Sequence, residues 1–437
     1  MKSHDKSPLA TQVVLYFQIH QPWRLRPFHF FDIGSNHDYF DTPDNEEIAA
    51  RVARQCYLPA NALLLKLIQK YPQLKVAFSI SGVALDQFQR FCPEVIDSFR
   101  KLATTGSVEF LGETDYHSLA SVVPGTEFEE QVLDHTAKLQ KYLGVHPSVF
   151  RNTELIYSNA IGRKICGLGF NGVFLDGIGN ILGTRSRHQL YHHPEDTGLR
   201  LFLRDYTLSD DIAFRFQEHG KKLTPEKFMT SLAKTPAHAK VVTLAMDYET
   251  FGEHQKKESG IFKFLEGLLT SLATSGRFHL IKPSDAVTTV LPAGPLDVPD
   301  TISWADTERD LSAWLGNDMQ QDAFENLVQL GTRVKALHDA ELTDRWRRLL
   351  TSDHFYYMST KKSNDGEVHA YFSPYASPYE AFVNYMNVIH DFTGLVGARE
   401  KDLSVANEQE ASLKAEAERR EMHTPVWAMK LENSYEK

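Results

Sequence analysis

Residues 241–254 read VVTLAMDYETFGEH, and this stretch says more about the fold than any other part of the chain. Val241–Met246 is apolar and rich in β-branched residues, which is typical of a strand buried in a parallel sheet. Acids follow it at once, as they do where a barrel strand delivers catalytic groups to the mouth of the barrel. Because alternate strand residues share a face, we expect Asp247 and Glu249 to point the same way and Tyr248 to point oppositely. Taken alone, the pattern also fits a strand that ends in an acidic turn.

Short apolar segments with strand character recur along the first 250 residues. There are seven of them: Val13–Ile19, Val76–Ser81, Val108–Leu111, Val149–Arg151, Gly172–Leu175, Leu199–Leu203 and Val241–Met246. Helical periodicity separates the early ones, over Asn45–Tyr71, Leu85–Thr104 and Phe128–Leu143. Alternating strands and helices predict a parallel sheet with right-handed crossovers. Because no Gly-rich phosphate loop is present, the pattern favours a closed or nearly closed barrel over a doubly wound nucleotide fold.

The pattern changes near residue 290. Leu291–Pro299 is rich in Pro and Gly and is expected to be a connector. Helical periodicity then dominates, over Phe324–Leu342, Asp344–Leu350, Pro378–Leu395 and Glu400–Glu421. We therefore expect a catalytic barrel over residues 1–290 and a helical domain over residues 291–437. The strongly charged Ala406–Arg420 is expected to be a solvated helix face.

The composition excludes several classes of partner. The 437 residues are 42% hydrophobic and 24% charged with a net charge of -10, as in an ordinary globular protein. Basic residues form no stripe, so we expect no nucleic-acid partner. No apolar run reaches the ~18 residues of a membrane span, and Val13–Ile19 reads as a first strand, so we expect no membrane partner. Three isolated cysteines suggest buried thiols in a reducing compartment, and therefore a cytoplasmic protein.

Titratable residues follow several of the predicted strands. His20 follows the first, Glu113 the third in VEFLGETDYHS, and Glu154 the fourth in FRNTELIYSN. Each alone also has a structural interpretation, as a strand-end His, an exposed strand or a surface Glu. Their convergence on one barrel mouth with Asp247 and Glu249 is far less expected by chance. Two carboxylates facing each other across a groove are what glycoside hydrolysis requires.

Five segments together resemble the motifs of glycoside hydrolase family 57. They are HQP at 20–22, GETDYH at 112–117, Glu154 after the fourth strand, DYETFG at 247–252 and TSDHFYYM at 351–358. The wording MDYETFGEH and TSDHFYYMSTK is similar to the α-amylase-type members. The resemblance spans residues 13 to 360. It implies an α/β fold, an incomplete (β/α)7 barrel followed by a C-terminal helical bundle that closes the active-site cleft.

The resemblance also implies roles for single residues. Glu154 would be the nucleophile and Asp247 the general acid/base of a retaining mechanism, a choice between Asp247 and Glu249 that strand parity leaves open. Glu249 would support Asp247 or bind sugar. His20 and Glu113 would contact the sugar, and the helical domain would contribute Asp353 and His354. We expect no metal and no cofactor, since no compact His/Asp ligand set and no EF-hand-like loop is present. RNTELIYSN lacks the Trp that often flanks the Glu in other members, so the shape of the bound-sugar site departs from the pattern.

Trp304 and Trp314 follow the connector, in ISWADTERDLSAWLGND. Aromatic faces stack on pyranose rings, so Trp304 is a candidate sugar platform. Both side chains could instead anchor the helical domain on the barrel.

The sequence therefore predicts a retaining hydrolase of α-1,4-glucans or maltooligosaccharides. A 4-α-glucanotransferase, a branching enzyme and other activities within the family remain open, as does a non-catalytic glucan-binding protein. A zinc-dependent sugar enzyme on a similar barrel would need a His-x-Asp ligand pair, and Pro22 occupies the Asp position. The sequence gives no oligomeric state.

Overall fold

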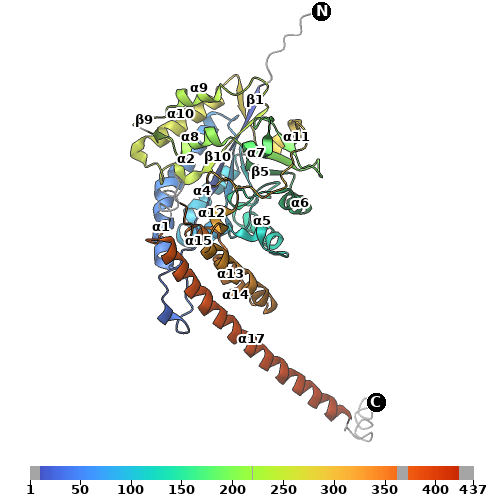
Figure 1. Cartoon of the computed structure of the whole chain (residues 1–437). Coiled ribbons are helices and arrows are strands. Elements are labelled where there is room, and N and C mark those ends of the chain that lie inside the picture. The colour runs from blue at the N-terminus through green and yellow to red at the C-terminus, as the bar shows by residue number, and fades with distance from the viewer. Residues whose placement is uncertain (1–9, 219, 362–372, 423–437) are drawn as a thin grey trace, which may run out of the picture.

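The sheet at the centre of the molecule has seven parallel strands. The computed structural model describes residues 10–218, 220–361 and 373–422. The strands are β1 (Thr11–Ile19), β2 (Val76–Ile80), β3 (Val108–Phe110), β4 (Val149–Arg151), β5 (Gly172–Asp176), β7 (Arg200–Arg204) and β10 (Val241–Asp247), in the spatial order β3-β2-β1-β10-β7-β5-β4 (Figure 1). All seven predicted strands are present, and the predicted incomplete barrel is confirmed.

The barrel is incomplete because two pairs of neighbouring strands are joined by very few backbone contacts. The outer strands β3 and β4 meet at an isolated parallel bridge between Gly112 and Phe150. The pair β10 and β7 has one register contact, Thr243 with Arg204. The pair β1 and β10, by contrast, is in register from Gln12 with Val241 to Gln18 with Asp247. The long pairing of β1 with β10 therefore ends at Asp247, one of the two acids that the sequence places at a strand end.

Four short strands lie outside this ring. β11 (Phe278–Leu280) adds to β1 in parallel, β6 (Tyr191–His192) pairs with β7 in antiparallel, and β8 (Gln217–Glu218) pairs with β9 (Lys221–Lys222). The predicted connector packs on the barrel and is not a free linker. Leu296 and Val298 are buried, the Leu296 N–H donates to the His192 carbonyl, and the Val298 carbonyl accepts from the Asn159 N–H.

Helices cover the outside of the barrel. They are α1 (Thr42–Val52), α2 (Leu58–Lys70), α3 (Gly82–Phe91), α4 (Pro93–Ala103), α5 (Glu127–Leu143), α6 (Asn159–Gly167), α7 (Gly179–Leu182), α8 (Tyr206–Ala213), α9 (Pro225–Leu232), α10 (Ile261–Ala273) and α11 (Pro283–Thr289). The single helix predicted over Leu85–Thr104 is wrong, because Pro93 begins a new helix after Cys92. A π-helical turn, η2 (Ala53–Tyr57), joins α1 to α2, so the predicted helix there begins earlier and is locally underwound.

Strand parity divides the side chains between two environments. Residues such as Val13, Leu15 and Phe17 of β1 pack outward against the helices. The alternate positions of the strands fill the barrel interior with a layer that includes Tyr16, Ala77, Leu111, Val149, Phe174, Phe202 and Ala245. One step further toward the carboxyl ends of the strands the interior turns polar, and the site begins there.

The C-terminal region is helical, as predicted. It contains α12 (Ser312–Leu315), α13 (Asp318–Ala336), α14 (Ala340–Leu349), α15 (Ser352–Tyr356) and α17 (Pro378–Met422). The two helices predicted over Pro378–Glu421 are one helix, whose second half runs away from the body (Figure 1). Residues 401–419 are exposed, in agreement with the expected solvated face. The boundary at residue 290 stays a prediction.

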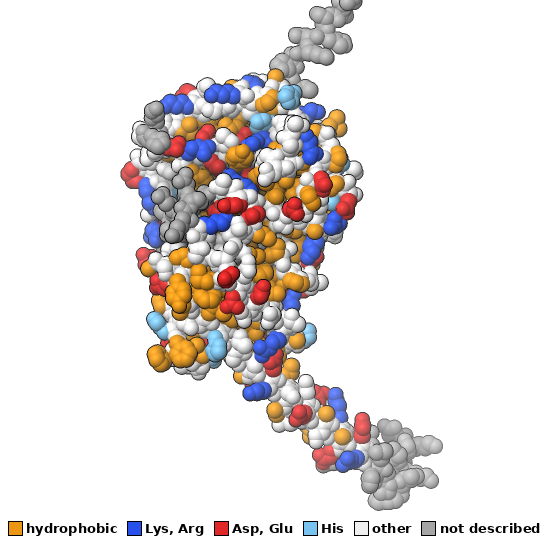
Figure 2. All heavy atoms as spheres, viewed as in Figure 1, with side chains coloured by type: hydrophobic (Ala, Val, Ile, Leu, Met, Phe, Trp, Pro, Cys, Tyr) orange, Lys and Arg blue, Asp and Glu red, His pale blue; other side chains and the backbone are white. Residues whose placement is uncertain are grey.

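The surface agrees with the charge pattern of the sequence. On the face seen in Figure 2, basic and acidic side chains are interspersed. Across the described ranges, no helix is both long and apolar enough to span a membrane. Cys56 and Cys92 are buried and Cys166 is half-buried, and all three are free thiols.

Candidate active site

A ring of polar side chains closes the barrel interior at the carboxyl ends of the strands. Six of them occupy inward-facing positions of their strands, namely Gln18, Ser79, Arg151, Asp176, Arg204 and Asp247, and the seventh, Glu113, lies beyond the end of β3. Arg151 and Arg204 are 0% and 3% exposed. Asp176 is fully buried, 3.5 Å from Arg204 and 3.1 Å from Arg309. These buried cations stabilise the negative charge of the neighbouring carboxylates at this mouth.

Glu154 lies in a 3-10 turn, η4 (Thr153–Leu155), directly after β4. Its backbone is left-handed, with φ of 54° and ψ of 24°, which is strained for a residue with a side chain. Each carboxylate oxygen has one donor. His117 Nε2 lies 3.0 Å from Oε1, and Trp304 Nε1 donates to Oε2 at 2.6 Å. Burial alone would raise the pKa of Glu154, but these donors and the charges of His117 and Arg151 lower it.

Asp247 is the last residue of β10 and is half-buried. Burial and the charge of Glu154 raise its pKa to about 6, against the lowering effects of Arg151, His117 and Arg204. Asp247 and Glu154 are therefore close enough to interact, and their pKa values are shifted in opposite directions. That is the arrangement which separates a proton donor from an ionised carboxylate.

Glu249 occupies a different environment from Asp247. The strand ends at Asp247, and Tyr248–Thr250 form a 3-10 turn, so the predicted alternation does not continue to Glu249. Tyr57, placed by the π-helical turn, donates to Glu249 Oε1 at 2.5 Å. Burial and the charge of Asp247 raise the pKa of Glu249 to about 8. The charge of Glu154 raises the pKa of Asp247, whereas Glu249 is bonded to Tyr57 and is affected by the charge of Asp247.

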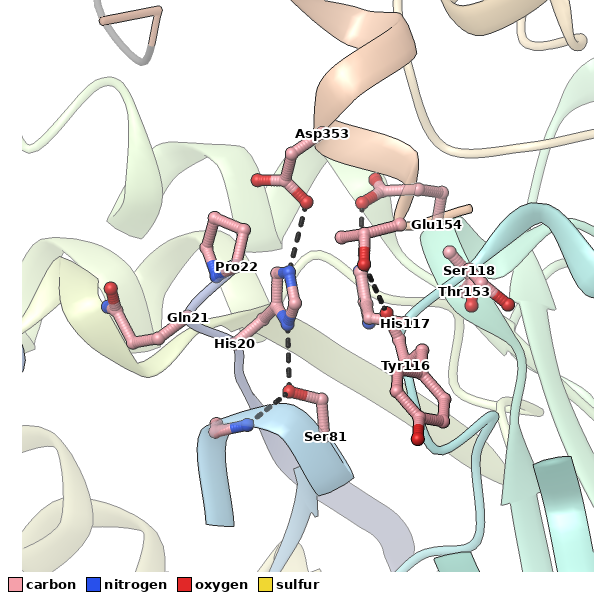
Figure 3. A network of polar contacts seen from close by, with 12 residues as sticks. His20, Gln21, Pro22, Ser81, Tyr116, His117, Ser118, Thr153, Glu154 and Asp353 are labelled. Atoms are coloured by element: carbon pink, nitrogen blue, oxygen red, sulfur yellow. Dashed lines mark hydrogen bonds and ion pairs between the residues drawn. The ribbon is translucent and has the colours of Figure 1, made fainter. Parts of the chain in front are cut away.

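His20 connects the first strand to the helical region. Its Nε2 lies 2.9 Å from Asp353 Oδ2 of α15, and its Nδ1 lies 2.8 Å from Ser81 Oγ (Figure 3). The structure therefore brings Asp353 into the site. His354 instead turns into the helical region, where it is 2% exposed and packs 5.7 Å from the Tyr385 ring. Burial lowers the pKa of His354 to about 4.

Glu113 lies below the mouth and is fully buried. Its Oε2 accepts hydrogen bonds from Gln18 at 3.2 Å and from Ser79 at 3.0 Å, and it lies 3.8 Å from Arg151. Burial would raise the pKa of Glu113, but His117, His135 and Arg151 lower it to about 2.

Trp304 serves Glu154 directly. Besides the indole hydrogen bond, its backbone N–H donates to the Glu154 carbonyl at 3.1 Å. Arg151 and Arg204 lie 5.0 and 5.4 Å from the centre of its ring. Trp304 is half-buried, whereas Trp314 is 1% exposed and packs in the helical region. The anchoring interpretation of Trp314 is thus the better supported one, while stacking of Trp304 on a sugar stays a prediction.

Sequence reasoning left several residues out of its candidate site. The most important is His117, which contacts Glu154, stacks on His20 at 4.0 Å and lies 3.6 Å from Glu113. Arg151 and Arg204 were also missed. Their signal was available, since a charged residue at an inward position of an apolar strand points into the barrel. No group of three or more His, Cys, Asp or Glu side chains in the described part of the chain is arranged to hold a metal ion.

The sequence and the fold of this chain are similar to those of known proteins. The family described as Glycosyl hydrolase family 57 matches residues 14–299. A protein of Methanocaldococcus jannaschii named "Putative alpha-amylase" is 41% identical over 399 residues, which cover 87% of this chain and 84% of the relative.

Two solved structures share the fold at low identity. A branching enzyme of Thermococcus kodakaraensis superposes with a TM-score of 0.64 at 12% identity, covering 83% of this chain and 87% of that one. An α-amylase of Thermotoga maritima gives 0.60 at 12% identity, covering 90% and 94%. The match to residues 14–299, about two thirds of the sequence, together with the M. jannaschii relative, shows that this chain belongs to glycosyl hydrolase family 57.

Proposed function

We propose that the chain hydrolyses α-1,4-glucosidic bonds of glucans or maltooligosaccharides and retains the anomeric configuration. The observation that carries the proposal is the pair of carboxyl groups at the barrel mouth, Glu154 with a lowered pKa and Asp247 with a pKa raised to about 6. The α-amylase name of the M. jannaschii relative supports the substrate class.

The proposed reaction has two steps. Glu154 attacks the anomeric carbon while Asp247 gives its proton to the departing glycosidic oxygen, so that the C1–O bond breaks and a glycosyl ester of Glu154 forms. Water then attacks the same carbon, Asp247 takes its proton, and Glu154 leaves as a carboxylate. Two inversions at one carbon give net retention. A retaining pair has its carboxyl groups about 5–5.5 Å apart.

The remaining residues would prepare these two groups. His117 and Trp304 hold Glu154, while Arg151 favours its ionised form. His20, Glu249 and Asp353 are the proposed sugar contacts, whereas Glu113 is fully buried and His354 packs in the helical region.

Product analysis on maltoheptaose tests the proposal. The purified chain should release only shorter maltooligosaccharides, and proton NMR of the first products should show the α anomer. Products longer than the substrate would instead identify a transferase. Sugar binding without turnover would identify a glucan-binding protein, and loss of activity in EDTA would favour metal-dependent chemistry. Any of these three results would overturn the proposal.

A further inference from the structure

His117 lies between two carboxylates that come from different strand ends. Its Nε2 is 3.0 Å from Glu154 Oε1, and its Nδ1 is 3.6 Å from Glu113 Oε2 (Figure 3 shows the Glu154 side). The His117 side chain is 2% exposed and that of Glu113 is 0% exposed. Nε2 needs a proton to donate to Glu154, and a proton on Nδ1 is stabilised by the Glu113 carboxylate, which lies at ion-pair distance but beyond hydrogen-bond distance. The geometry therefore favours an imidazolium.

The backbone of His117 is fixed as firmly as its ring. Its φ of 48° is left-handed, a conformation that few residues with a side chain adopt. The N–H of His117 donates to Thr114 at 3.1 Å, and its carbonyl accepts from the N–H of Ser352 in α15 at 3.0 Å. A strained residue held at both ends indicates that the orientation of its side chain matters.

The neighbouring His20 has the complementary protonation. The Ser81 hydroxyl accepts from the N–H of Ala84, so its own hydrogen is free to point to His20 Nδ1. His20 then needs one proton only, on Nε2, to donate to Asp353. Burial and the charge of His117 lower the pKa of His20, as expected for a neutral ring that stacks on a cation.

We infer that His117 is a positioning residue of the proposed reaction, an imidazolium that orients the Glu154 nucleophile and has Glu113 as its permanent counterion. The inference rests on the proposed function of Glu154. It assigns Glu113 a role beneath the site, in place of the sugar contact that the family resemblance suggested.

The charge balance of the reaction explains why two carboxylates are needed. When Glu154 becomes an ester it loses its negative charge, and the proton that moves in that step comes from Asp247. The proton on His117 stays where it is. A buried cation with no counterion would be costly at that moment. Glu113 remains ionised throughout, because Gln18, Ser79 and Arg151 also stabilise its charge.

The charged surroundings support a protonated ring. Burial alone would lower the pKa of His117, but the neighbouring carboxylates of Glu113 and Glu154 raise it to about 9. The titratable or charged groups that interact with it from the packed elements are Glu113, Glu154, Asp247, Asp353, Arg151 and His20.

A pair of variants tests the catalytic side. His117→Asn suits the left-handed backbone but cannot bridge both carboxylates. We expect a kcat about a hundredfold lower, the usual cost of losing one preorganised donor, with KM within about threefold. His117→Ala should regain activity when imidazole is added. His37→Asn removes another imidazole–carboxylate pair, 2.7 Å from Asp391 and outside the site, and is the matched control with unchanged kcat. Unchanged kcat in His117→Asn, or lowered thermal stability without imidazole rescue in His117→Ala, would overturn the inference.

A titration without substrate separates this inference from the proposed function. NMR of labelled histidine in the whole chain should show His117 protonated above pH 8, and Glu113→Gln should lower its pKa by more than one unit. A neutral His117 at pH 7 would overturn the inference even if the chain cleaves glucan. A wild-type chain that cleaves no glucan would overturn the proposed function, and the positioning role would fall with it, while a protonated His117 would still establish its pairing with Glu113.

Discussion

The indole nitrogen of Trp304 lies 2.6 Å from Glu154 Oε2, although 150 residues separate the two along the chain. The bond joins the turn after β4 to a loop that leads into the helical region. It gives the proposed nucleophile a donor that the barrel strands do not supply, and it lowers the pKa of Glu154 together with His117 and Arg151.

Trp304→Phe should therefore weaken catalysis while leaving the fold intact. Loss of the donor raises the pKa of Glu154, so the acidic limb of the kcat/KM profile should move to higher pH, with kcat lower by about tenfold or more. Trp346→Phe is the matched control, because it removes an indole bond to the Leu327 carbonyl in the helical region. It should lower the melting temperature without moving the pH profile. An unmoved acidic limb in Trp304→Phe would contradict the role of the bond.

Removing either proposed catalytic acid should abolish hydrolysis. Glu154→Gln and Asp247→Asn keep the size of each side chain, so reducing-sugar release should vanish while thermal unfolding changes little. Azide should tell the two roles apart in the alanine variants. With Glu154→Ala it would attack the vacated face and give the β-glucosyl azide, and with Asp247→Ala it would open the ester and give the α azide. Full activity of either amide variant on an α-1,4-glucan would refute the assignment.

The pH dependence of the wild-type chain should reflect Asp247. This group must hold a proton to assist the leaving oxygen, and its pKa is about 6. We expect kcat/KM to fall about tenfold for each pH unit above that value. Glu249→Gln should leave this alkaline limb in place, since Glu249 has a pKa of about 8 and is already neutral near pH 6. An alkaline limb that moves in Glu249→Gln would show that Glu249, and not Asp247, is the proton donor.

The charge on His117 should also contribute to folding stability. Its pKa is about 9 in the folded chain against 6.5 for an ordinary histidine, so folding is favoured whenever the ring is protonated. The contribution is complete below pH 6.5 and is lost as the pH rises toward 9. The difference in unfolding free energy between wild type and His117→Asn should therefore shrink across that window in urea titrations. A difference that grows with pH would show that the folded ring is neutral.

Replacing two glycines of the helical region by alanine should change the stability of the fold in opposite directions. A Cβ on Gly331 of α13 would lie 2.3 Å from the Trp346 ring, so Gly331→Ala should cost about 1–3 kcal/mol through overpacking. Gly394 of α17 has no neighbour within 4 Å, so Gly394→Ala should stabilise the helix by about 0.5–1 kcal/mol. Calorimetry that gives both changes the same sign would contradict the packing of α13 on α14.

The strands could be predicted because each is a short apolar run with covered faces, as in other parallel sheets. The helix boundaries were harder, since the apolar periodicity of Leu85–Thr104 continues across Pro93 although the backbone does not. Strands as short as β6 and β11 carry no periodicity of their own.

Only the site residues that lie at strand ends or in motifs could be predicted from the sequence. Asp247, Glu154 and His20 follow strands, so their convergence could be inferred from topology. The indole bond of Trp304 and the bond from Asp353 to His20 join segments 150 and 333 residues apart, and nothing local in the sequence encodes such distances. His117 was visible in the motif, but its place between two carboxylates depends on a left-handed backbone that no spacing rule predicts.

The docking of α15 against His117 and His20 has a consequence for the synthesis of the chain. The barrel strands are complete once residue 247 has left the ribosome, and N-terminal units generally fold first. Trp304, Ser352 and Asp353 emerge later, yet they hold Glu154, His117 and His20 in place. A nascent barrel would thus carry both acids without the ability to use them, and catalysis would begin only when the helical region arrives.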